Sequence, residues 1–207
     1  MRGRFITMEG GEGAGKSTMM ERVADWLQDS GHRVVRTREP GGTVLAEKLR
    51  DILLDRNNLS VSGKAELLLM FAARAQHLDE LIRPALARGD CVLCDRFTDA
   101  TWAYQGGGRG LPREDIAVLE TLVHGDLQPD LTLLLDLPVE QGLRRASRRS
   151  QADRFEQESP DFFNKVRQAY LARAAADPTR FAVIDASPGI EQVWSQIHAV
   201  LQARLAP

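Results

Sequence analysis

The residues with the clearest chemical meaning stand near the start of the chain. Gly10, Gly15, Lys16 and Ser17 match the pattern G-x-x-x-x-G-K-[ST] within "MEGGEGAGKST". In such a loop, backbone N–H groups and a helix N-terminus carrying about half a positive charge surround phosphate groups. A lysine reaches the β- and γ-phosphates, and a hydroxyl binds Mg²⁺. The motif therefore predicts a nucleotide triphosphate site.

The motif does not identify the reaction, because the phosphoryl group can pass to water or to a second substrate. A GTPase would carry an N-K-x-D segment for guanine, and this chain has only "NKVR" at 164–167, within a predicted helix. A kinase would need a second anion site facing the first. A second anion site would therefore distinguish a kinase from an enzyme that transfers the phosphoryl group to water.

Arginines recur where a second anion would lie. Arg38, Arg50, Arg74 and Arg96 fall near the carboxyl ends of predicted strands or on the helices that follow, where open α/β sheets bind ligands. Asp95, directly before Arg96, occupies the usual place of a carboxylate that supports Mg²⁺. A guanidinium donates two parallel hydrogen bonds to a phosphomonoester. Any one of these arginines alone would be typical of a solvated surface.

Another arginine-rich stretch, "LRRASRRSQADR", contains Arg144, Arg145, Arg148, Arg149 and Arg154. By itself it is typical of a solvated helix face. Phosphoryl transfer to a second substrate must exclude water, however, and a mobile lid achieves this. We therefore expect a lid at about residues 144–156.

Short apolar runs alternate with longer helical patterns along the chain. The predicted strands are 4–10, 33–39, 91–95, 131–137 and 181–185. Such alternation predicts an α/β fold with a parallel sheet covered on both faces. Helices are expected from Lys16, ending near Gly31, and from Ser159–Pro160, with Pro84 interrupting a helix over 64–88.

Composition sets further bounds. The 207 residues, 43% of them hydrophobic, suit one domain, and a net charge of −2 argues against binding to nucleic acid or an anionic membrane. The apolar runs are shorter than the roughly 18 residues of a membrane span, and the N-terminus does not resemble a secretion signal. Cys91 and Cys94 should point to opposite faces of a strand as buried thiols, which agrees with a cytoplasmic location.

Taken together, "GGEGAGKST", "TREPGGT", "MFAAR", "CDRFTDATWAYQGGGRG", "PDLTLLLD" and "DRFEQE" resemble the bacterial thymidylate kinases, in order, from about Phe5 to Ala186. The phosphate loop has no arginine, so the chain is similar to the variant with lid arginines. The resemblance implies a P-loop NTPase fold of the nucleoside monophosphate kinase type, with a five-stranded parallel sheet, in a single domain over 1–207. It also implies ATP-dependent phosphorylation of dTMP to dTDP, for dTTP synthesis, by a Mg²⁺-dependent homodimer.

The resemblance also implies roles for individual residues. Lys16, Arg96 and Arg149 would stabilise charge on the moving group, with Arg145 and Arg154 as rivals to Arg149, and Glu12 would orient the acceptor. Ser17 and Asp95 would serve the metal. ATP would contact the loop and one lid arginine: Gly10, Gly11, Glu12, Gly13, Ala14, Gly15, Lys16, Ser17, Thr18 and Arg145.

The acceptor site implied by the resemblance comprises Glu39, Pro40, Arg50, Met70, Phe71, Arg74, Arg96, Thr101, Tyr104 and Gln105. Arg50 and Arg96 would hold the 5′-phosphate, while Arg74, Thr101 and Gln105 would contact thymine. Tyr104 would crowd the 2′ position of the sugar. Many family members stack a phenylalanine on thymine where this chain has Met70, and Phe71 is next to it, so either could cover the ring.

Two alternatives remain open from the sequence. The acceptor could be dUMP, dCMP or another phosphorylated metabolite, because the thymine methyl group is worth only about 1 kcal/mol of burial. The chain could also be a nucleotide-dependent switch that hydrolyses ATP slowly. The switch would turn over ATP without any monophosphate, whereas the kinase would not.

Overall fold

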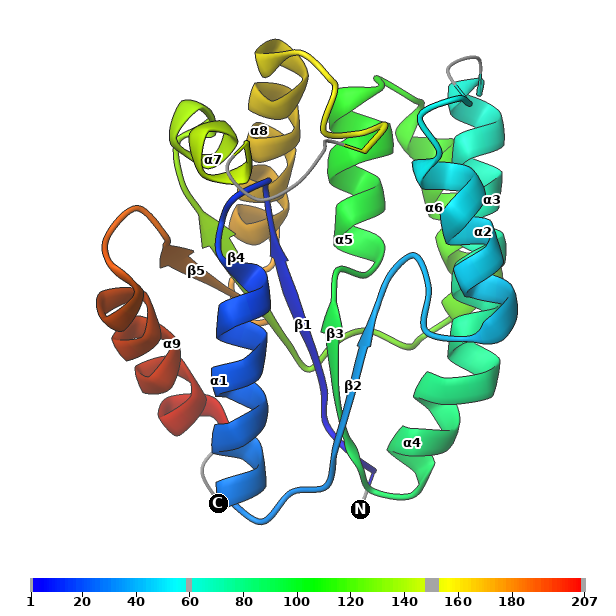
Figure 1. The fold of residues 1–207 in the computed structure, drawn as a ribbon. Coiled ribbons are helices and arrows are strands. Elements are labelled where there is room, and N and C mark those ends of the chain that lie inside the picture. Colours follow the sequence, from blue (N-terminus) through cyan, green and yellow to red (C-terminus); the bar gives the residue numbers. More distant parts are fainter. Residues whose placement is uncertain (1, 59–60, 148–152, 206–207) are drawn as a thin grey trace.

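The computed structural model describes residues 2–58, 61–147 and 153–205. Its centre is a parallel sheet of strand order β2-β3-β1-β4-β5 (Figure 1). The strands are β1 (Phe5–Gly10), β2 (Val34–Arg38), β3 (Cys91–Asp95), β4 (Leu131–Asp136) and β5 (Phe181–Asp185). All five predicted strands are confirmed, each to within one residue at either end.

Helices cover both faces of the sheet, as predicted. The helices are α1 (Lys16–Asp29), α2 (Val44–Leu54), α3 (Gly63–His77), η1 (Leu78–Ile82), α4 (Arg83–Ala87), α5 (Thr98–Thr101), η2 (Trp102–Gly108), α6 (Arg113–His124), α7 (Val139–Ala146), α8 (Pro160–Ala176) and α9 (Ile190–Leu205). α1 and α9 share a core with one face of the sheet, and α8, η1 and α4 pack on the other.

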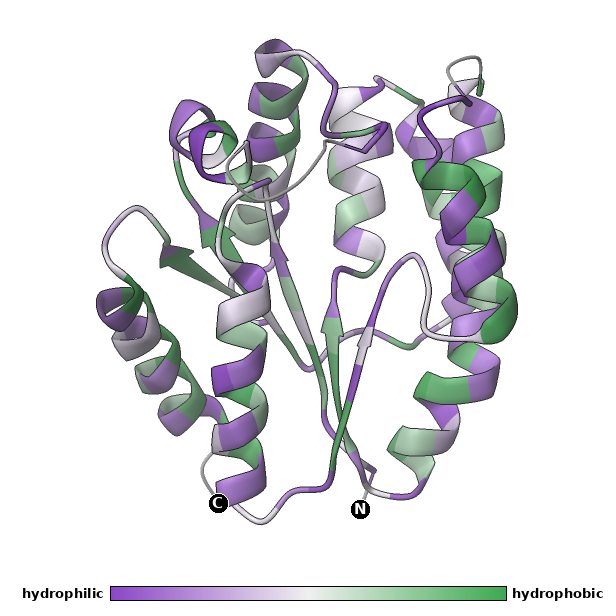
Figure 2. Ribbon diagram, viewed as in Figure 1, coloured by the Kyte–Doolittle hydropathy of each residue, from purple (hydrophilic) through white to green (hydrophobic). Residues whose placement is uncertain are grey.

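Strand side chains alternate between these two cores. Ile6 and Met8 of β1 pack with α1, whereas Phe5 packs with η1 and α4. Because both faces are covered, β3 and β4 are apolar along most of their length, as Figure 2 shows in green. Cys91 and Cys94 lie in different cores, so the prediction of two buried thiols on opposite faces is confirmed.

The register of the sheet brings the motifs together. Met8 lies beside Asp95, and Gly10 lies beside Leu135. Arg38 at the end of β2 also pairs with Asp95. Three segments therefore begin side by side at the carboxyl ends of the strands: the phosphate loop, the Asp95–Arg96 pair and the segment after β2.

The interruption predicted at Pro84 takes the form of a π-helical segment, η1, between α3 and α4. Proline lacks an N–H group and clashes with the carbonyl four residues earlier, so the backbone widens before it. The other predicted helix signals are also present. The Ser159 hydroxyl accepts a hydrogen bond from the Phe162 N–H group at the start of α8, and Gly31 has φ of 85° after α1.

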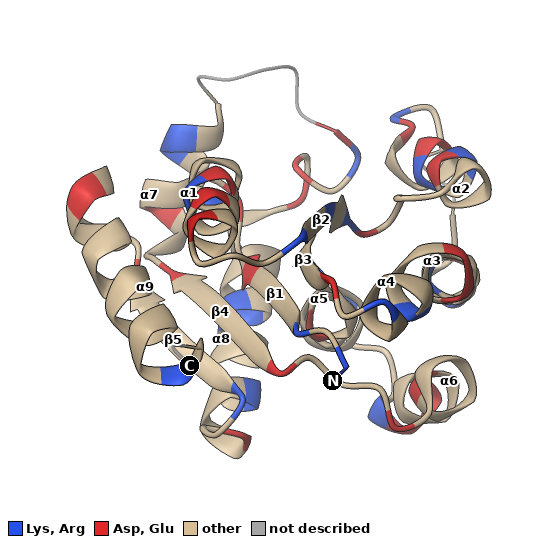
Figure 3. Ribbon diagram, turned by 90° about the horizontal axis from the view of Figure 1, so that it is seen from below, with Lys and Arg blue, Asp and Glu red and all other residues tan. Residues whose placement is uncertain are grey.

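Charged residues lie mainly on the helices and in the loops. Figure 3, seen from below, shows β4 and β5 without charge along most of their length. Within the described part of the chain, the helices are all too short or too polar to cross a bilayer.

Candidate active site

The phosphate loop joins β1 to α1 in a conformation that depends on glycine. Gly13 and Gly15 have φ of 69° and 89°, in the left-handed region where other residues are strained. The Lys16 ammonium group donates to the carbonyl oxygens of Gly10 and Gly11, at 3.1 and 3.2 Å. Burial lowers the pKa of Lys16, and the neighbouring Arg96 guanidinium lowers it further. The loop thus encloses a cation at the start of a helix.

The phosphate loop also packs closely against α7. A Cβ atom on Gly13 would lie 2.1 Å from the carbonyl oxygen of Gly142, and one on Gly142 would lie 2.3 Å from that of Glu12. The two backbones therefore touch without side chains between them. This contact fixes the start of the arginine-rich segment against the loop.

One cleft of about 300 Å³ joins the loop to the predicted acceptor residues. Its lining includes both sets: Glu12, Gly13, Ala14, Gly15, Lys16, Ser17, Glu39, Pro40, Arg50, Met70, Arg74, Asp95, Arg96, Thr101, Tyr104 and Gln105. A second group of cations thus faces the phosphate loop, as a kinase requires.

Arg96, Glu12 and Tyr104 meet at the middle of this cleft. The Arg96 Nη2 and the Tyr104 hydroxyl each donate to Glu12 Oε1 at 2.7 Å, and the Arg96 guanidinium lies over the Tyr104 ring. Burial alone would raise the pKa of Glu12, but Arg96 and Lys16 hold it below its usual value. Glu12 is thus an acceptor of hydrogen bonds beside the two cations that would hold phosphate.

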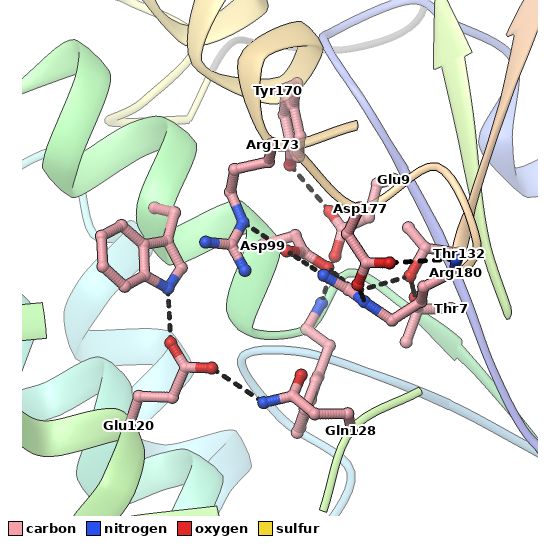
Figure 4. Close-up of polar contacts among 12 residues, drawn as sticks. Thr7, Glu9, Asp99, Glu120, Gln128, Thr132, Tyr170, Arg173, Asp177 and Arg180 are labelled. Carbon is pink, nitrogen blue, oxygen red and sulfur yellow. Dashed lines mark hydrogen bonds and ion pairs between the residues drawn. The ribbon is translucent and has the colours of Figure 1, made fainter. Parts of the chain in front are cut away.

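Glu9 supports the position of Arg96 through hydrogen bonds. Arg96 has φ of 67°, unusual for a residue with a side chain, and the next N–H group, on Phe97, donates to Glu9 Oε1 at 2.7 Å. The other Glu9 oxygen accepts a hydrogen bond from the Tyr170 hydroxyl at 2.7 Å, as Figure 4 shows. Tyr170 in turn accepts one from Arg96 at 3.3 Å. Glu9 is therefore linked directly to the backbone that follows Arg96, and to the Arg96 guanidinium through Tyr170.

Burial, and then the charge of Asp99, raise the pKa of Glu9 to about 8. The unfolded chain releases this proton near its ordinary pKa of 4.5, so the folded state loses stability as pH rises through that interval. Glu9→Gln does not titrate there. From pH 5.5 to pH 7.5, the free energy of unfolding of Glu9→Gln should therefore rise by about 2 kcal/mol relative to that of the parent. Urea unfolding at the two pH values measures this difference, and parallel curves would contradict it.

A second buried cluster anchors the helix that follows Arg96. Asp99, on α5, is fully buried and binds Arg173 at 2.5 Å and Arg180 at 2.6 Å. Figure 4 shows both guanidinium groups converging on its carboxylate, and Arg180 continuing to Thr132. α5 is thereby tied to α8 and to the approach to β5. This arrangement positions Thr101 and the start of η2 in the cleft.

Glu39 organises the acceptor end of the cleft. It accepts a hydrogen bond from Arg74 Nε at 2.7 Å, and the His77 ring lies 3.0 Å away. Burial would raise the pKa of Glu39, but Arg74 and His77 hold it below its usual value. Arg74 Nη2 donates to Thr101 and to the Phe97 carbonyl group, whereas its Nη1 is buried with no partner among the described residues. One donor of Arg74 therefore remains for a ligand.

Glu39→Gln should destabilise the protein by about 3–5 kcal/mol, because it leaves the buried Arg74 guanidinium without its counter-charge. Thermal and urea unfolding measure the loss. Glu191→Gln is the matched control, since Glu191 pairs with Arg22 in an exposed ion pair and its removal should barely move the midpoint. Equal effects of the two substitutions would contradict this account of Glu39.

The residues around Ser17 and Asp95 fit a magnesium ion. Both line the cleft, and the Asp95 Oδ1 atom is buried without a partner among the described residues. Oxygen ligands, few of them from protein, suit Mg²⁺ beside phosphates. Among the described residues, no group of three or more His, Cys, Asp or Glu side chains forms a separate metal site. The predicted metal residues therefore lie together, beside the phosphate loop.

Some predicted residues lie elsewhere. Phe71 is buried against Leu67 and Ile116 and does not line the cleft, whereas Met70 does. Placing Phe71 in the acceptor site is therefore not supported, because its side chain fills the core beneath α3. Thr18 also lies outside the cleft lining, one residue into α1 beyond Ser17. Gly10 and Gly11 line a neighbouring pocket against β4 and α7.

The arginines of the predicted lid have different positions. Arg145 donates to the carbonyl oxygens of Ala186 and Ser187, at 2.8 and 2.9 Å, in the loop after β5. Arg154 pairs with Glu66 at 2.7 Å and donates to the Leu53 carbonyl group, and it is not among the residues that line the cleft. Arg148 and Arg149 lie outside the described residues.

Some residues that line the cleft were not predicted as site residues from the sequence. Asp153, Phe155 and Glu156 line it, and they fall in the "DRFEQE" motif, which was the available signal. Phe97 and Ala100 also line it and fall in the "CDRFTDATWAYQGGGRG" motif, and Ala146 falls in the arginine-rich stretch, whereas Leu54 carries no such signal. The supporting residues Glu9 and Tyr170 were likewise not singled out.

Comparison with known proteins agrees with this geometry. The family described as thymidylate kinase matches residues 8–197. The chain belongs to the thymidylate kinase family. It is 64% identical to the thymidylate kinase of Chromohalobacter salexigens, covering 99% of this chain and 97% of that one. It is 61% identical to the thymidylate kinase of Pseudomonas putida, over 97% and 96% of the two chains.

A solved structure is also similar to this thymidylate kinase family member. The crystal structure of thymidylate kinase from Ehrlichia chaffeensis superposes with a TM-score of 0.79 and 33% sequence identity, over 98% of this chain and 99% of that one. The P-loop fold of the nucleoside monophosphate kinase type, expected from the sequence, is therefore confirmed.

Proposed function

We propose that this protein transfers the γ-phosphoryl group of ATP to dTMP, producing dTDP for dTTP synthesis. The observation that carries the proposal is the single cleft in which the phosphate loop faces Arg50, Arg74 and Arg96. A nucleotide triphosphate on the loop and a monophosphate among these arginines would meet end to end. Membership of the thymidylate kinase family supports dTMP as the acceptor.

Different residues of the chain would then have different roles in phosphoryl transfer. Lys16 and Arg96 neutralise charge on the moving group, and Glu12 orients the acceptor. Ser17 and Asp95 would hold Mg²⁺, which supplies further positive charge at the phosphates. Arg149 contributes the cation that the phosphate loop lacks, from a mobile lid at about 144–156 within a single domain. Arg145, which is bonded to the Ala186 and Ser187 carbonyl groups, would contact ATP.

The acceptor base would lie against Met70, between Arg74 and Gln105. The unpartnered Arg74 Nη1 supports this placement, because a base carbonyl group would satisfy a buried donor. Thr101 and Gln105 complete the contacts, and Arg50 joins Arg96 at the 5′-phosphate. Tyr104, fixed by Glu12, occupies the 2′ side of the sugar and excludes a ribose hydroxyl.

The protein would act as a homodimer in the cytoplasm, with no nucleic acid or membrane partner. Exposed apolar side chains on α2, α3 and α6 support a dimer face: Val44, Leu45, Ile52, Leu68, Val118 and Leu122. Analytical ultracentrifugation tests this, with Leu122→Glu and Val118→Glu expected to give monomers.

A coupled ADP-release assay tests the reaction. With ATP and Mg²⁺, turnover should require a monophosphate and be greatest with dTMP, with dUMP and dCMP as comparisons. Equal rates with all three would defeat the assignment of the acceptor. Steady ATP hydrolysis without any monophosphate would favour the nucleotide-dependent switch instead.

A further inference from the structure

Glu66, on α3, is a buried carboxylate that the catalytic roles above do not use. It is fully buried, and its Oε1 atom accepts a hydrogen bond from Gln105 Nε2 at 2.8 Å. Arg154 Nη2 lies 2.7 Å from Oε2, and Arg109 approaches both oxygens at 3.3 Å. Two guanidinium groups thus compensate its charge, and Gln105 is its link to the cleft.

Glu66 fixes which end of the Gln105 amide faces the ligand. An ionised carboxylate has only acceptors, so the Gln105 NH₂ group must face it, and the amide carbonyl oxygen is left for other partners. Gln105 lines the cleft, and among the described residues no donor is hydrogen-bonded to that oxygen. The cleft therefore receives an acceptor from Gln105.

Arg74 supplies a hydrogen-bond donor to the same cleft. Its Nε is fixed by Glu39 and its Nη2 by Thr101, which leaves the buried Nη1 as a donor without a described partner. An acceptor and a donor in one cleft complement a pyrimidine that has an N3–H donor and a C4 carbonyl acceptor. Cytosine reverses both, with an acceptor at N3 and an amino group at C4.

We propose that Glu66 is a positioning residue that sets the base selectivity of this enzyme by holding the Gln105 carbonyl oxygen toward the N3–H of the acceptor base. The inference rests on the proposed function. A site built to form such a hydrogen bond strongly rejects a ligand that cannot complete it, because its buried polar groups remain unpaired. Without Glu66, the Gln105 amide can turn over and accept the reversed pattern.

The test compares dTMP with 5-methyl-dCMP, which keeps the methyl group and reverses only the hydrogen-bonding edge. The ratio of their kcat/KM values is measured on the same enzyme preparation, so the fraction of folded protein cancels. Glu66→Gln should lower this ratio at least tenfold, because its amide can donate to or accept from Gln105. Glu66→Asp keeps the charge for Arg109 and Arg154, protects folding, and should lower the ratio through a longer contact.

Two controls separate positioning from general structural effects. Arg109→Lys leaves the carboxylate in place and should leave the ratio unchanged. In a Gln105→Leu background, Glu66→Gln should have no further effect on the ratio, because the group it acts through is absent.

An unchanged ratio in both Glu66 variants, or in Gln105→Leu, would overturn the inference while leaving dTMP phosphorylation intact. Absence of dTMP phosphorylation by the parent protein would instead refute the proposed function.

Discussion

Lys16→Ala is expected to lower kcat about 10³-fold while the protein still binds dTMP. The ammonium group lies within the phosphate loop, bonded to the carbonyl oxygens of Gly10 and Gly11, where a transferring phosphoryl group would develop charge. Removing a fixed donor from such a place costs transition-state stabilisation more than ground-state binding. Steady-state ADP release measures kcat, and calorimetry measures dTMP affinity.

Lys165→Ala is the matched control for this experiment, because Lys165 forms an exposed ion pair with Asp161 on α8. Its kinetic constants should equal those of the parent. If Lys16→Ala retained kcat and lost only ATP affinity, the ammonium group would serve binding and the charge for transfer would have to come from the arginines.

Arg149→Ala should lower kcat by about 10³ or more, within the range that arginine fingers supply in related chemistry. The structure assigns other tasks to two neighbouring arginines: Arg145 binds the Ala186 and Ser187 carbonyl groups, and Arg154 binds Glu66. Single-turnover measurement of phosphoryl transfer, with both nucleotides saturating, reports this step directly.

Two arginine variants serve as controls. Arg144→Ala removes an exposed arginine at the end of α7 and should change kcat little. Arg145→Ala should raise the KM for ATP more than it lowers kcat. A loss of dTMP affinity in Arg149→Ala with kcat preserved would place Arg149 at the acceptor instead.

The five strands and the helices α1, α3 and α8 could be predicted from the sequence because each depends on a local signal, whereas α2, α5, η2 and α6 were not predicted. β3, β4 and β5 are mostly apolar runs, α8 begins at Ser159–Pro160, and Pro84 marks the break after α3. These signals act over a few residues, so one chain is enough to interpret them.

The site could be predicted only in part, because its supporting contacts join distant segments. Glu9 meets Tyr170 across 161 residues, and Glu66 meets Gln105 across 39. Neither pair has a spacing that a sequence pattern could reveal. Met70 and Phe71 show a different difficulty: they precede Arg74 by four and three residues, and both spacings place a side chain on the same helix face. Only the packing of α3 against α6 separates them.

The close contact between Gly13 and Gly142 limits which side chains the phosphate loop can accommodate. Any side chain at position 13 would collide with the backbone of α7, and Ala14 is already buried. At Gly11, by contrast, a Cβ atom would meet nothing within 4 Å in the described part of the chain. The phosphate loop could therefore gain a side chain at position 11 without meeting the rest of the described protein, whereas one at position 13 would displace α7.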